Sequence, residues 1–313
     1  MSAIPEFTSL SRVRDTLYRH NSGQLREREP LALRTTYRVG GEAKLLYAPY
    51  EEADVAAAVQ TVCEEQVPLY VLGGGSNILI ADNGIDGLLV DTRSYLNTIS
   101  LTGDRIVAQA GASLLRLVRM ASRAGLGGIA KLAGIPGTLG GGLRMNCGAF
   151  GVEISEHLEW VRGVSANGEI VEFEKSDITW GYRSVPELQT VVITAAGFRF
   201  PTDDPNKLVS EMREVLAKRR ASQPLQYPSA GSVFKRPPND FAGRLIEAAG
   251  LKGVRCGDAE VSQKHAGFVV NTGKATAADI YRLIRTVQAA VFALYGVQLE
   301  MEQVLWGFEN AAS

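Results

Sequence analysis

Hydrophobic and polar positions along the chain change between helical and strand-like spacing, which predicts mixed α and β structure. Apolar residues recur every three or four positions over 51–66 and again after Ser113, as on one face of a helix. Short apolar runs predict strands, at 69–72, 78–80, 88–90, 106–110 and 191–193. The sequence contains no internal repeat, so repeat architectures are excluded.

A hairpin and a domain boundary are indicated by turn-forming residues. Strand-like runs at 158–164 and 170–173 flank Asn167 and Gly168, a pair that readily adopts the positive φ angles of a tight turn. Prolines and aspartates then gather over Pro201–Pro205, a composition typical of a linker. We predict an antiparallel hairpin and a boundary near residue 203.

The last part of the chain is predicted to open with a helix over 208–216 and to contain a clearer helix further on. Thr276 and Asp279 have the spacing of a capping box, and Gly296 is a typical helix stop. The apolar face of this helix would consist of Ile280, Leu283, Ile284, Val287, Val291 and Leu294. The first 30 residues, in contrast, are polar, and we expect an irregular lead-in over 1–30.

Composition narrows the class of protein. The chain has 313 residues, of which 45% are hydrophobic and 21% charged, as in globular proteins. Lys plus Arg is 33 and Asp plus Glu is 34, a balance that argues against a nucleic-acid or membrane partner. No stretch is apolar enough for a membrane helix or signal peptide, so we expect a soluble, cytoplasmic protein. Three scattered cysteines and three histidines predict neither disulfides nor a metal site.

Glycine is the unusual residue type, and its first cluster follows a predicted buried strand. The cluster consists of Gly73, Gly74 and Gly75, followed by Ser76 and Asn77. Successive backbone N–H groups in such a turn can surround an anion, to which the two polar side chains add donors. The spacing differs from the G-x-G-x-x-G of dinucleotide folds. A glycine hairpin without a ligand is the alternative.

A second cluster covers 133–151. Its candidate cofactor-binding residues are Gly134, Ile135, Pro136, Gly137, Thr138, Gly140, Gly141, Asn146, Gly148 and Ala149. A segment with so few side chains can lie flat against a large planar or phosphate-bearing ligand. The alternative is a mobile loop. Two such segments in one domain favour a single extended cofactor.

Candidate polar side chains are scattered along the second half of the chain. They are Tyr182, Arg183, Ser232, Lys235, Glu300 and Glu302. An arginine can bind a carboxylate through two hydrogen bonds, a serine hydroxyl can transfer a proton, and a glutamate can hold or return that proton. Taken singly, each of these residues is also typical of a surface ion pair or a turn.

Together, the motifs resemble those of the UDP-N-acetylenolpyruvoylglucosamine reductase (MurB) family of bacterial peptidoglycan synthesis. The resemblance extends from about residue 31 to 307 through TYRVGG (36–41), VLGGGSN (71–77), AGIPGTLGGG (133–142), NCGAFG (146–151), GYR (181–183), AGSVFK (230–235), LIEAAGLKG (245–253) and KHAGFVVNTGKATAAD (264–279). Order and spacing match across this breadth, whereas any one motif would be weak.

The resemblance implies an α+β fold with a C-terminal substrate-binding domain. The FAD-binding region, of the vanillyl-alcohol-oxidase (PCMH) type, would have two α+β subdomains, about 31–92 and 93–203. An α+β substrate-binding domain would follow over 204–313. The FAD pyrophosphate would lie against Gly73–Asn77, and the rest of the cofactor against Gly134–Gly142 and Asn146–Gly151.

The resemblance also implies the reaction. NADPH would reduce the flavin, which would then reduce UDP-N-acetylglucosamine enolpyruvate to UDP-N-acetylmuramate. Ser232 would be the proton donor, while Arg183 and Glu302 would polarise the substrate carboxylate. Glu302 is preferred to Glu300 because the family's functional glutamate is the second of two acids. Tyr182 and Lys235 would bind the substrate, and the enzyme would be a monomer.

Some residues depart from the family pattern. Ser184 directly follows Arg183, where the family usually has its serine one position later, and Arg236 replaces a common asparagine. The stretch between Tyr182 and Pro201 is too short for an inserted substrate loop, which indicates the shorter subgroup. His265, in a matched motif, is predicted to be a structural hydrogen-bonding residue. Two alternatives remain: a sugar or lactone oxidase with the same cofactor fold, and a flavin-binding protein without turnover.

Overall fold

The computed structural model describes residues 9–20 and 22–308, and contacts divide the chain into two compact units. The first unit comprises the chain up to Glu29, Ala43–Gly74 and Asp86–Leu216. The second comprises Pro30–Glu42, Gly75–Ile85 and the chain from Ala217 onward. Each unit is therefore assembled from segments that are far apart in the sequence.

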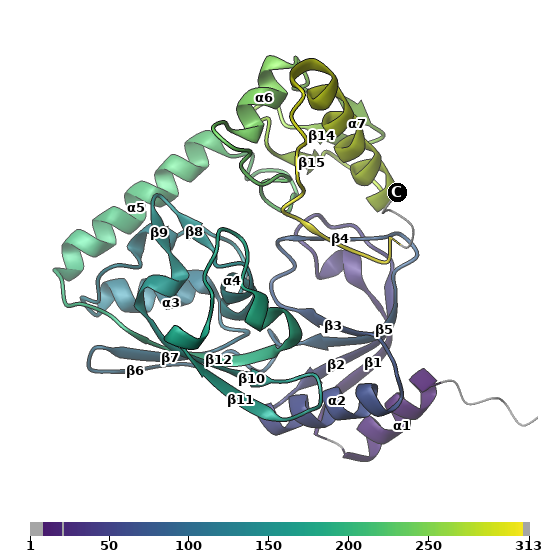
Figure 1. Cartoon of the computed structure of the whole chain (residues 1–313), viewed down its shortest axis with the longest axis vertical. Coiled ribbons are helices and arrows are strands. Elements are labelled where there is room, and N and C mark those ends of the chain that lie inside the picture. Colours follow the sequence, from purple (N-terminus) through teal and green to yellow (C-terminus); the bar gives the residue numbers. More distant parts are fainter. Residues whose placement is uncertain (1–8, 21, 309–313) are drawn as a thin grey trace, which may run out of the picture. The chain divides into compact units, whose positions relative to one another are not determined.

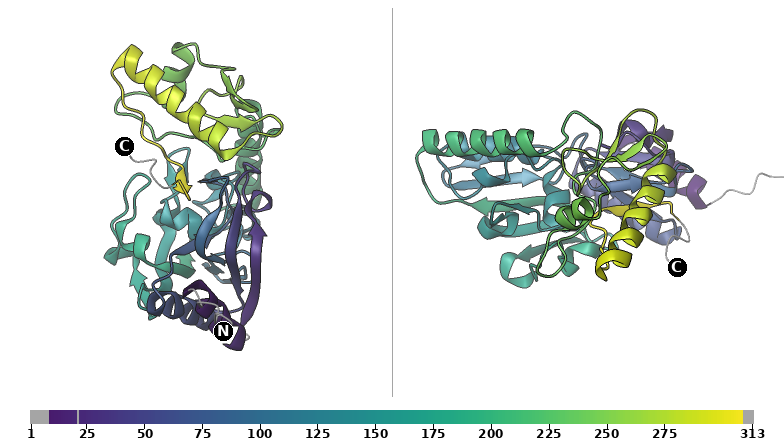
Figure 2. Two further views of the ribbon diagram at one scale, coloured as in Figure 1. Left: turned by 90° about the vertical axis from the view of Figure 1, so that its right-hand side faces the viewer. Right: turned by 90° about the horizontal axis from the view of Figure 1, so that it is seen from above.

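A four-stranded sheet in the first unit has the order β1-β2-β5-β3. Its strands are β1 (Gly23–Pro30), β2 (Glu42–Pro49), β3 (Leu69–Leu72) and β5 (Ile85–Asp91). Two helices, α1 (Ser9–His20) and α2 (Glu52–Glu64), lie along this sheet (Figure 1, Figure 2). The hydrophobic cluster that they share with it contains Val13, Leu17, Leu45, Tyr47, Ala58, Val62, Leu88 and Val90.

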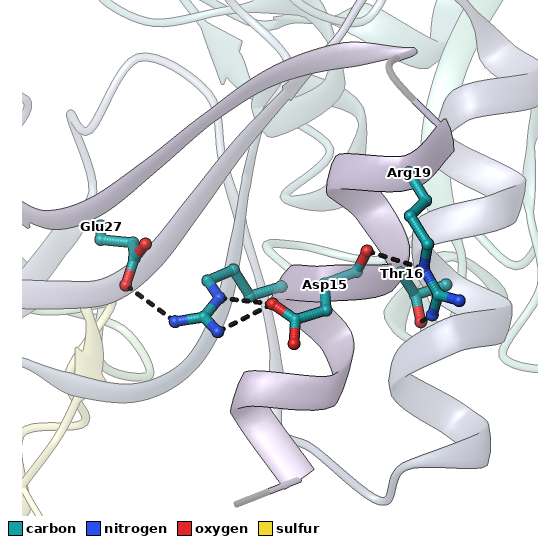
Figure 3. A network of polar contacts seen from close by, with 5 residues as sticks. Asp15, Thr16, Arg19 and Glu27 are labelled. Atoms are coloured by element: carbon teal, nitrogen blue, oxygen red, sulfur yellow. Dashed lines mark hydrogen bonds and ion pairs between the residues drawn. The ribbon is translucent and has the colours of Figure 1, made fainter. Parts of the chain in front are cut away.

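The prediction of an irregular lead-in is wrong for the described part of it, because α1 and β1 are regular elements; residues 1–8 and 21 lie outside the described residues. Val13 and Leu17 are four positions apart, so they share the buried face of α1. Figure 3 shows its polar contacts: Arg14 donates to Asp15 and pairs with Glu27 of β1. Arg19 donates to the Asp15 backbone oxygen and to Thr16. Most residues of α1 are polar or charged, so its narrow apolar stripe gives only a weak helical pattern in the sequence.

A five-stranded antiparallel sheet follows in the same unit, in the order β11-β10-β12-β7-β6. Its strands are β6 (Ile99–Thr102), β7 (Arg105–Gln109), β10 (Leu158–Val164), β11 (Ile170–Glu174) and β12 (Val192–Arg199). The predicted hairpin is confirmed, since β10 pairs with β11 and Gly168 in the turn has a φ of 87°. Val55 and Val59 of α2 also pack on this sheet, so α2 contacts both sheets.

Shorter elements complete the first unit. The helix predicted after Ser113 is confirmed as α3 (Leu114–Arg123), which buries Leu114, Leu117 and Val118. The others are α4 (Leu139–Arg144), β8 (Gly148–Ala149), β9 (Val152–Glu153) and the 3-10 helices η2 (Ala130–Leu132), η3 (Ile154–His157), η4 (Lys175–Asp177) and η5 (Pro186–Thr190). Together they position the second glycine cluster.

The chain passes from the first unit to the second inside a long helix, α5 (Pro205–Ser222), visible as one unbroken helix in Figure 2. Met212 and Val215 on its apolar face pack into the main hydrophobic cluster of the first unit, which also contains Leu117, Val161 and Phe198. The division by contacts therefore falls after Leu216, whereas the sequence places a boundary at Pro201–Pro205. The two boundaries differ because α5 follows the linker in sequence but packs its apolar face against the first unit.

The second unit combines helices with short strands. A three-stranded sheet contains β13 (Arg255–Cys256), β14 (Ala259–Val261) and β15 (Val269–Asn271). β4 (Ile78–Ile80) pairs in parallel with β16 (Val304–Trp306). The helices of this unit are η1 (Leu31–Leu33), α6 (Ala242–Ala248) and α7 (Ala277–Tyr295). Among the described residues, no helix has the length and apolar character needed to cross a membrane.

The predicted helix ends of α7 are confirmed. The Thr276 hydroxyl accepts a hydrogen bond from the Asp279 backbone N–H at 3.0 Å, and Gly296 has a φ of 67°. Ile280, Leu283, Ile284, Val287 and Val291 are buried, as predicted. The prediction is wrong for Leu294, which is 61% exposed, because the buried cluster on α7 ends one turn earlier, at Val291.

A distant carboxylate also caps α7. The two oxygens of Asp82 accept hydrogen bonds from the backbone N–H groups of Ala277 and Ala278, at 2.8 and 2.9 Å. These N–H groups have no partner within the helix, so the carboxylate satisfies them and complements the positive end of the helix dipole.

We expect Asp82→Ala to lower the free energy of unfolding by about 1 kcal/mol, because two backbone donors lose their acceptor. Thermal unfolding followed by circular dichroism would measure the change. Asp86→Ala is the matched control, since Asp86 forms an exposed ion pair with Lys44. Equal unfolding midpoints for the two variants would contradict the cap.

Candidate active site

The two glycine clusters come into contact within the first unit. Gly73 and Gly74 leave the end of β3 and lie directly against Gly137 and Thr138. A Cβ atom on Gly73 would lie 2.2 Å from Thr138 Oγ1, and one on Gly74 would lie 2.5 Å from Gly137 Cα. Only glycine permits so close an approach of two backbone segments. The structure thus brings together the segments for which the sequence predicts one shared ligand.

Two buried polar atoms of the second glycine cluster have no internal partner. Among the described residues, Thr138 Oγ1 and Asn146 Oδ1 are buried side-chain atoms that make no hydrogen bond within the protein. Leaving such atoms buried and unpaired costs free energy, which a polar ligand recovers. The two glycine segments expose backbone groups where they meet, and the two side-chain oxygens can accept further hydrogen bonds. Such a surface fits a flat ligand rich in hydroxyl and amide groups. The residues present therefore fit FAD.

Some residues of the second cluster have structural reasons for their identity. The backbone N–H of Gly140 donates to Ala110 O at 2.8 Å, and a Cβ on Gly140 would lie 3.0 Å from the Ala110 Cβ. Ile135 packs against the main hydrophobic cluster. Gly148 and Ala149 form β8 and pair with β9. Close packing alone thus accounts for Gly140, whereas it does not account for the unpaired atoms of Thr138 and Asn146.

Arg183 lies in a tight turn that contacts the NCGAFG segment. Gly181 N–H donates to Ser184 O at 2.9 Å and Ser184 N–H donates back to Gly181 O at 3.3 Å, so Tyr182 and Arg183 are the central turn residues. Ser184, which departs from the family spacing, closes this turn. Arg183 has a φ of 55°, a left-handed conformation that a non-glycine residue adopts at some cost.

The Arg183 side chain is held over the same segment. Its guanidinium donates to the backbone oxygens of Asn146 and Gly148, each at 3.4 Å, and lies 5.0 Å from the centre of the Tyr182 ring. Asn146 contacts the turn in return, because its Nδ2 donates to Gly181 O at 3.2 Å and to Glu153 Oε2 at 2.7 Å. The first unit therefore joins a predicted catalytic arginine to a predicted cofactor segment.

The second unit places Ser232 beside Glu302. Glu302 N–H donates to Val233 O at 2.8 Å, and Lys235 N–H donates to Glu300 O at 2.9 Å. Phe234 and Met301 form an antiparallel bridge between these two segments. Ser232 is exposed, while Val233 and Phe234 after it are buried at 1% and 4% exposure. The serine hydroxyl is thus presented at the surface of a rigid backbone pairing.

Asn77 connects the first glycine cluster to the same place. Its Nδ2 donates to Glu302 O at 3.1 Å, and Val304 N–H donates to Asn77 O at 3.0 Å. Gly75, with a φ of 61°, lies so close to η1 that a Cβ would be 2.2 Å from Arg34 O. Gly75, Asn77, Ser232 and Glu302 are therefore held in one unit, to which Arg183 does not belong.

The two neighbouring glutamates have different surroundings. The Glu300 side chain is 71% exposed and pairs with Lys235 Nζ at 3.2 Å. Glu302 is half-buried, and Gln303 after it is buried. Lys235, predicted to bind substrate, thus already has an anionic partner on the same surface.

Sequence reasoning missed two buried polar residues. Tyr37 and Gln303 are 0% and 4% exposed, and Tyr37 Oη donates to Gln303 Oε1 at 3.1 Å. Burial raises the pKa of the Tyr37 phenol well above its ordinary value, so the hydroxyl stays protonated. Tyr37 belongs to the TYRVGG motif, for which the sequence predicts no catalytic or binding role. Position alone, one residue after Glu302, was the available signal for Gln303.

His265 has the structural role predicted for it. Its Nδ1 accepts a hydrogen bond from Gly267 N–H at 3.1 Å, and Gly267 O accepts one from Val233 N–H at 2.9 Å. Burial lowers the pKa of His265, which keeps this nitrogen available as an acceptor. No group of three or more potential metal-ligating side chains occurs within residues 9–20 and 22–308.

Two family profiles match the chain. The profile of the UDP-N-acetylenolpyruvoylglucosamine reductase C-terminal domain matches residues 223–306. The profile of an FAD binding domain matches residues 43–174. The second range includes both glycine clusters, and the first includes Ser232 and Glu302.

Relatives extend over nearly the whole chain. A UDP-N-acetylenolpyruvoylglucosamine reductase from Symbiobacterium thermophilum is 41% identical over 286 residues, which are 91% of this chain and 93% of that protein. One from Pediococcus pentosaceus is 42% identical over 290 residues, 92% of this chain and 96% of that protein. The crystal structure of the reductase from Thermus caldophilus superimposes with a TM-score of 0.77 at 33% identity, covering 91% of this chain and 98% of that one.

These similarities confirm the expected α+β fold, with an FAD-binding domain before the C-terminal domain. Because identity of this level extends over nine-tenths of the chain, this chain belongs to the UDP-N-acetylenolpyruvoylglucosamine reductase family.

Proposed function

We propose that Ser232, Glu302 and Arg183 carry out the protein's part of the reductase chemistry. As a family member, the chain is an FAD-dependent oxidoreductase that uses NADPH to reduce UDP-N-acetylglucosamine enolpyruvate to UDP-N-acetylmuramate in peptidoglycan precursor synthesis. The observation that carries the residue assignment is the hydrogen bond from Glu302 N–H to Val233 O, which fixes Glu302 next to Ser232.

The proposed cofactor contacts lie in both glycine clusters. Gly73, Gly74, Gly75 and Ser76 would offer backbone N–H groups to the pyrophosphate. Thr138 and Asn146 would use the side-chain oxygens that have no partner within the protein. The remaining contacts would be made by Asn77, Gly134, Ile135, Pro136, Gly137, Gly140, Gly141, Gly148 and Ala149. When bound, FAD supplies the hydride chemistry, which no side chain can provide.

The protein itself must complete the reduction with a proton. Adding a hydride to one carbon of the enolpyruvyl double bond places negative charge on the adjacent carbon and its carboxylate. Ser232, exposed on its loop, would donate a proton to that carbon, and Glu302 beside it would stabilise the reacting groups. Arg183 would polarise the carboxylate, since a guanidinium binds carboxylates in bidentate fashion.

Two further residues are proposed to bind the substrate. Tyr182 is 51% exposed beside Arg183, and Lys235 carries a cationic amine near Ser232; both would bind the UDP-sugar. We further propose that the enzyme works as a monomer in the cytoplasm, without nucleic-acid or membrane partners. A net charge of −1 supports the last point.

An anaerobic absorbance titration tests the activity directly. NADPH should bleach the visible flavin band of the purified protein, and UDP-N-acetylglucosamine enolpyruvate should restore it. Bleaching without recovery would instead favour oxidation of another sugar, and a protein without flavin would contradict the cofactor assignment.

We expect Ser232→Ala to leave flavin bleaching by NADPH unchanged and to slow recovery with substrate by about 10²- to 10⁴-fold, the usual effect of removing a general acid. Stopped-flow absorbance separates the two half-reactions. Equal loss in both would rule out Ser232 as the proton donor.

Arg183→Lys should lower kcat/KM for the UDP-sugar about 10- to 100-fold, because lysine cannot reproduce a planar, bidentate donor. Arg162→Lys is the matched control: Arg162 also lies over an aromatic ring, Trp160, and pairs with Glu172 on the surface. Similar steady-state kinetics for the two variants would contradict the role of Arg183.

Glu302→Gln should slow the substrate half-reaction about 100-fold, since removing the charge alters the group beside the proton donor. Glu300→Gln should act mainly on KM, because Glu300 is exposed and contacts Lys235. The reverse order of effects would move the catalytic assignment to Glu300.

A further inference from the structure

A buried polar pair joins four separate segments of the second unit. Tyr37 Oη donates to Gln303 Oε1 at 3.1 Å, and Gln303 Nε2 donates to Ala230 O at 3.1 Å. The Tyr37 backbone oxygen in turn accepts from Asn271 Nδ2 at 3.2 Å. Both ends of the Gln303 amide are therefore used, and the side chain has a single orientation that satisfies its partners.

Two of the segments that this pair joins carry residues of the proposed site. Gln303 directly follows Glu302, and Ala230 is two residues before Ser232. The hydrogen bond from Gln303 to Ala230 O thus fixes the start of the loop that carries Ser232 to the segment that carries Glu302, just before β16. Beyond Ser232, the hydrogen bond from Glu302 N–H to Val233 O fixes the other side.

Gly231 lies between the two attachments and does not itself restrict the loop. It has a φ of 74°, and a Cβ atom on it would meet no other atom within 4 Å. Glycine in open space has a large choice of backbone conformations, so neighbouring structure must restrict it. The bond to Ala230 O restricts the chain directly before this glycine, in addition to the burial of Ala230 itself.

We propose that Tyr37 and Gln303 are positioning residues that hold the Ser232 hydroxyl at the place where it donates its proton. This proposal rests on the proposed role of Ser232 and deepens it. Tyr37 orients the amide of Gln303, and Gln303 holds Ala230; neither side chain touches the substrate. The TYRVGG motif thereby acquires a function in this reaction.

The polar nature of the pair supports a positioning role. Apolar side chains would fill this space without specifying how the Ser232 loop is aligned with the segment that carries Glu302. A buried hydrogen-bonded network, in contrast, specifies one arrangement, because any other leaves its groups unsatisfied. The Tyr37 phenol is a dependable donor, since burial raises its pKa and keeps the hydroxyl neutral.

Tyr37→Phe in the holoenzyme tests the proposal. Removing one hydroxyl leaves Gln303 Oε1 without its donor, so we expect the substrate half-reaction to slow about 10- to 100-fold, as for small misplacements of reacting groups. Flavin bleaching by NADPH should change less than about twofold. The solvent deuterium isotope effect on the substrate half-reaction should increase, because proton transfer then limits its rate more strongly.

Tyr47→Phe is the matched control. Tyr47 is also fully buried and loses a hydrogen bond, to Ser22 O at 2.7 Å, but it lies in the first unit. A purely structural role for Tyr37 predicts equal effects of the two variants on both half-reactions, and this result would overturn the proposal. Should Tyr37→Phe fail to fold, Gln303→Asn, which keeps the amide but shortens its reach, is judged by the same comparison.

Ser232→Ala, measured in parallel, distinguishes a failure of the positioning role from a failure of the proposed role of Ser232. If it slows the substrate half-reaction and Tyr37→Phe does not, the positioning role is wrong while the proposed function stands. If Ser232→Ala has no effect, the proposed role of Ser232 fails and takes the positioning role with it.

Discussion

Parallel pairing between β4 and β16 is the interaction on which the catalytic part of this structure depends. It places Val304 opposite Ile78 and so brings Asn77 to Glu302, residues that are 225 positions apart in the sequence. Glu302 in turn forms a backbone hydrogen bond to Val233, beside Ser232. The backbone pairing thus connects Asn77, Ser232 and Glu302, which are proposed to bind the cofactor, donate the proton and support that transfer. Their spacing is therefore set mainly by the backbone.

Buried polar groups in this protein fall into two kinds, and the difference has a functional meaning. The hydroxyl of Tyr37 and the amide of Gln303 have partners within the chain, so they fix geometry. Thr138 Oγ1 and Asn146 Oδ1 have none among the described residues, so they are suited to a ligand. The same cost of burying an unpaired polar atom explains both kinds. At the proposed site, the paired groups of Tyr37 and Gln303 hold the geometry, whereas the unpaired oxygens of Thr138 and Asn146 are available to a ligand.

Two residues near the proposed chemistry have strained backbone conformations. Asn146 and Arg183 have φ angles of 39° and 55°, and their segments hold each other through hydrogen bonds in both directions. Such conformations persist only where neighbouring contacts enforce them. Glu153, whose carboxylate accepts from Asn146 Nδ2, is one of those contacts.

Helix caps, turn glycines and apolar periodicity are local properties, so the sequence alone predicts most of the elements and all of the motifs. Thr276, Gly296 and the Asn167–Gly168 turn behave as their residue types dictate. Which segments meet depends on contacts between residues that are far apart in the chain. The helix α1, the backward packing of α5 and the exposure of Leu294 depended on distant partners. So did the bond between Gln303 and Ala230, because a glutamine one residue after a glutamate has no local pattern that names its partner.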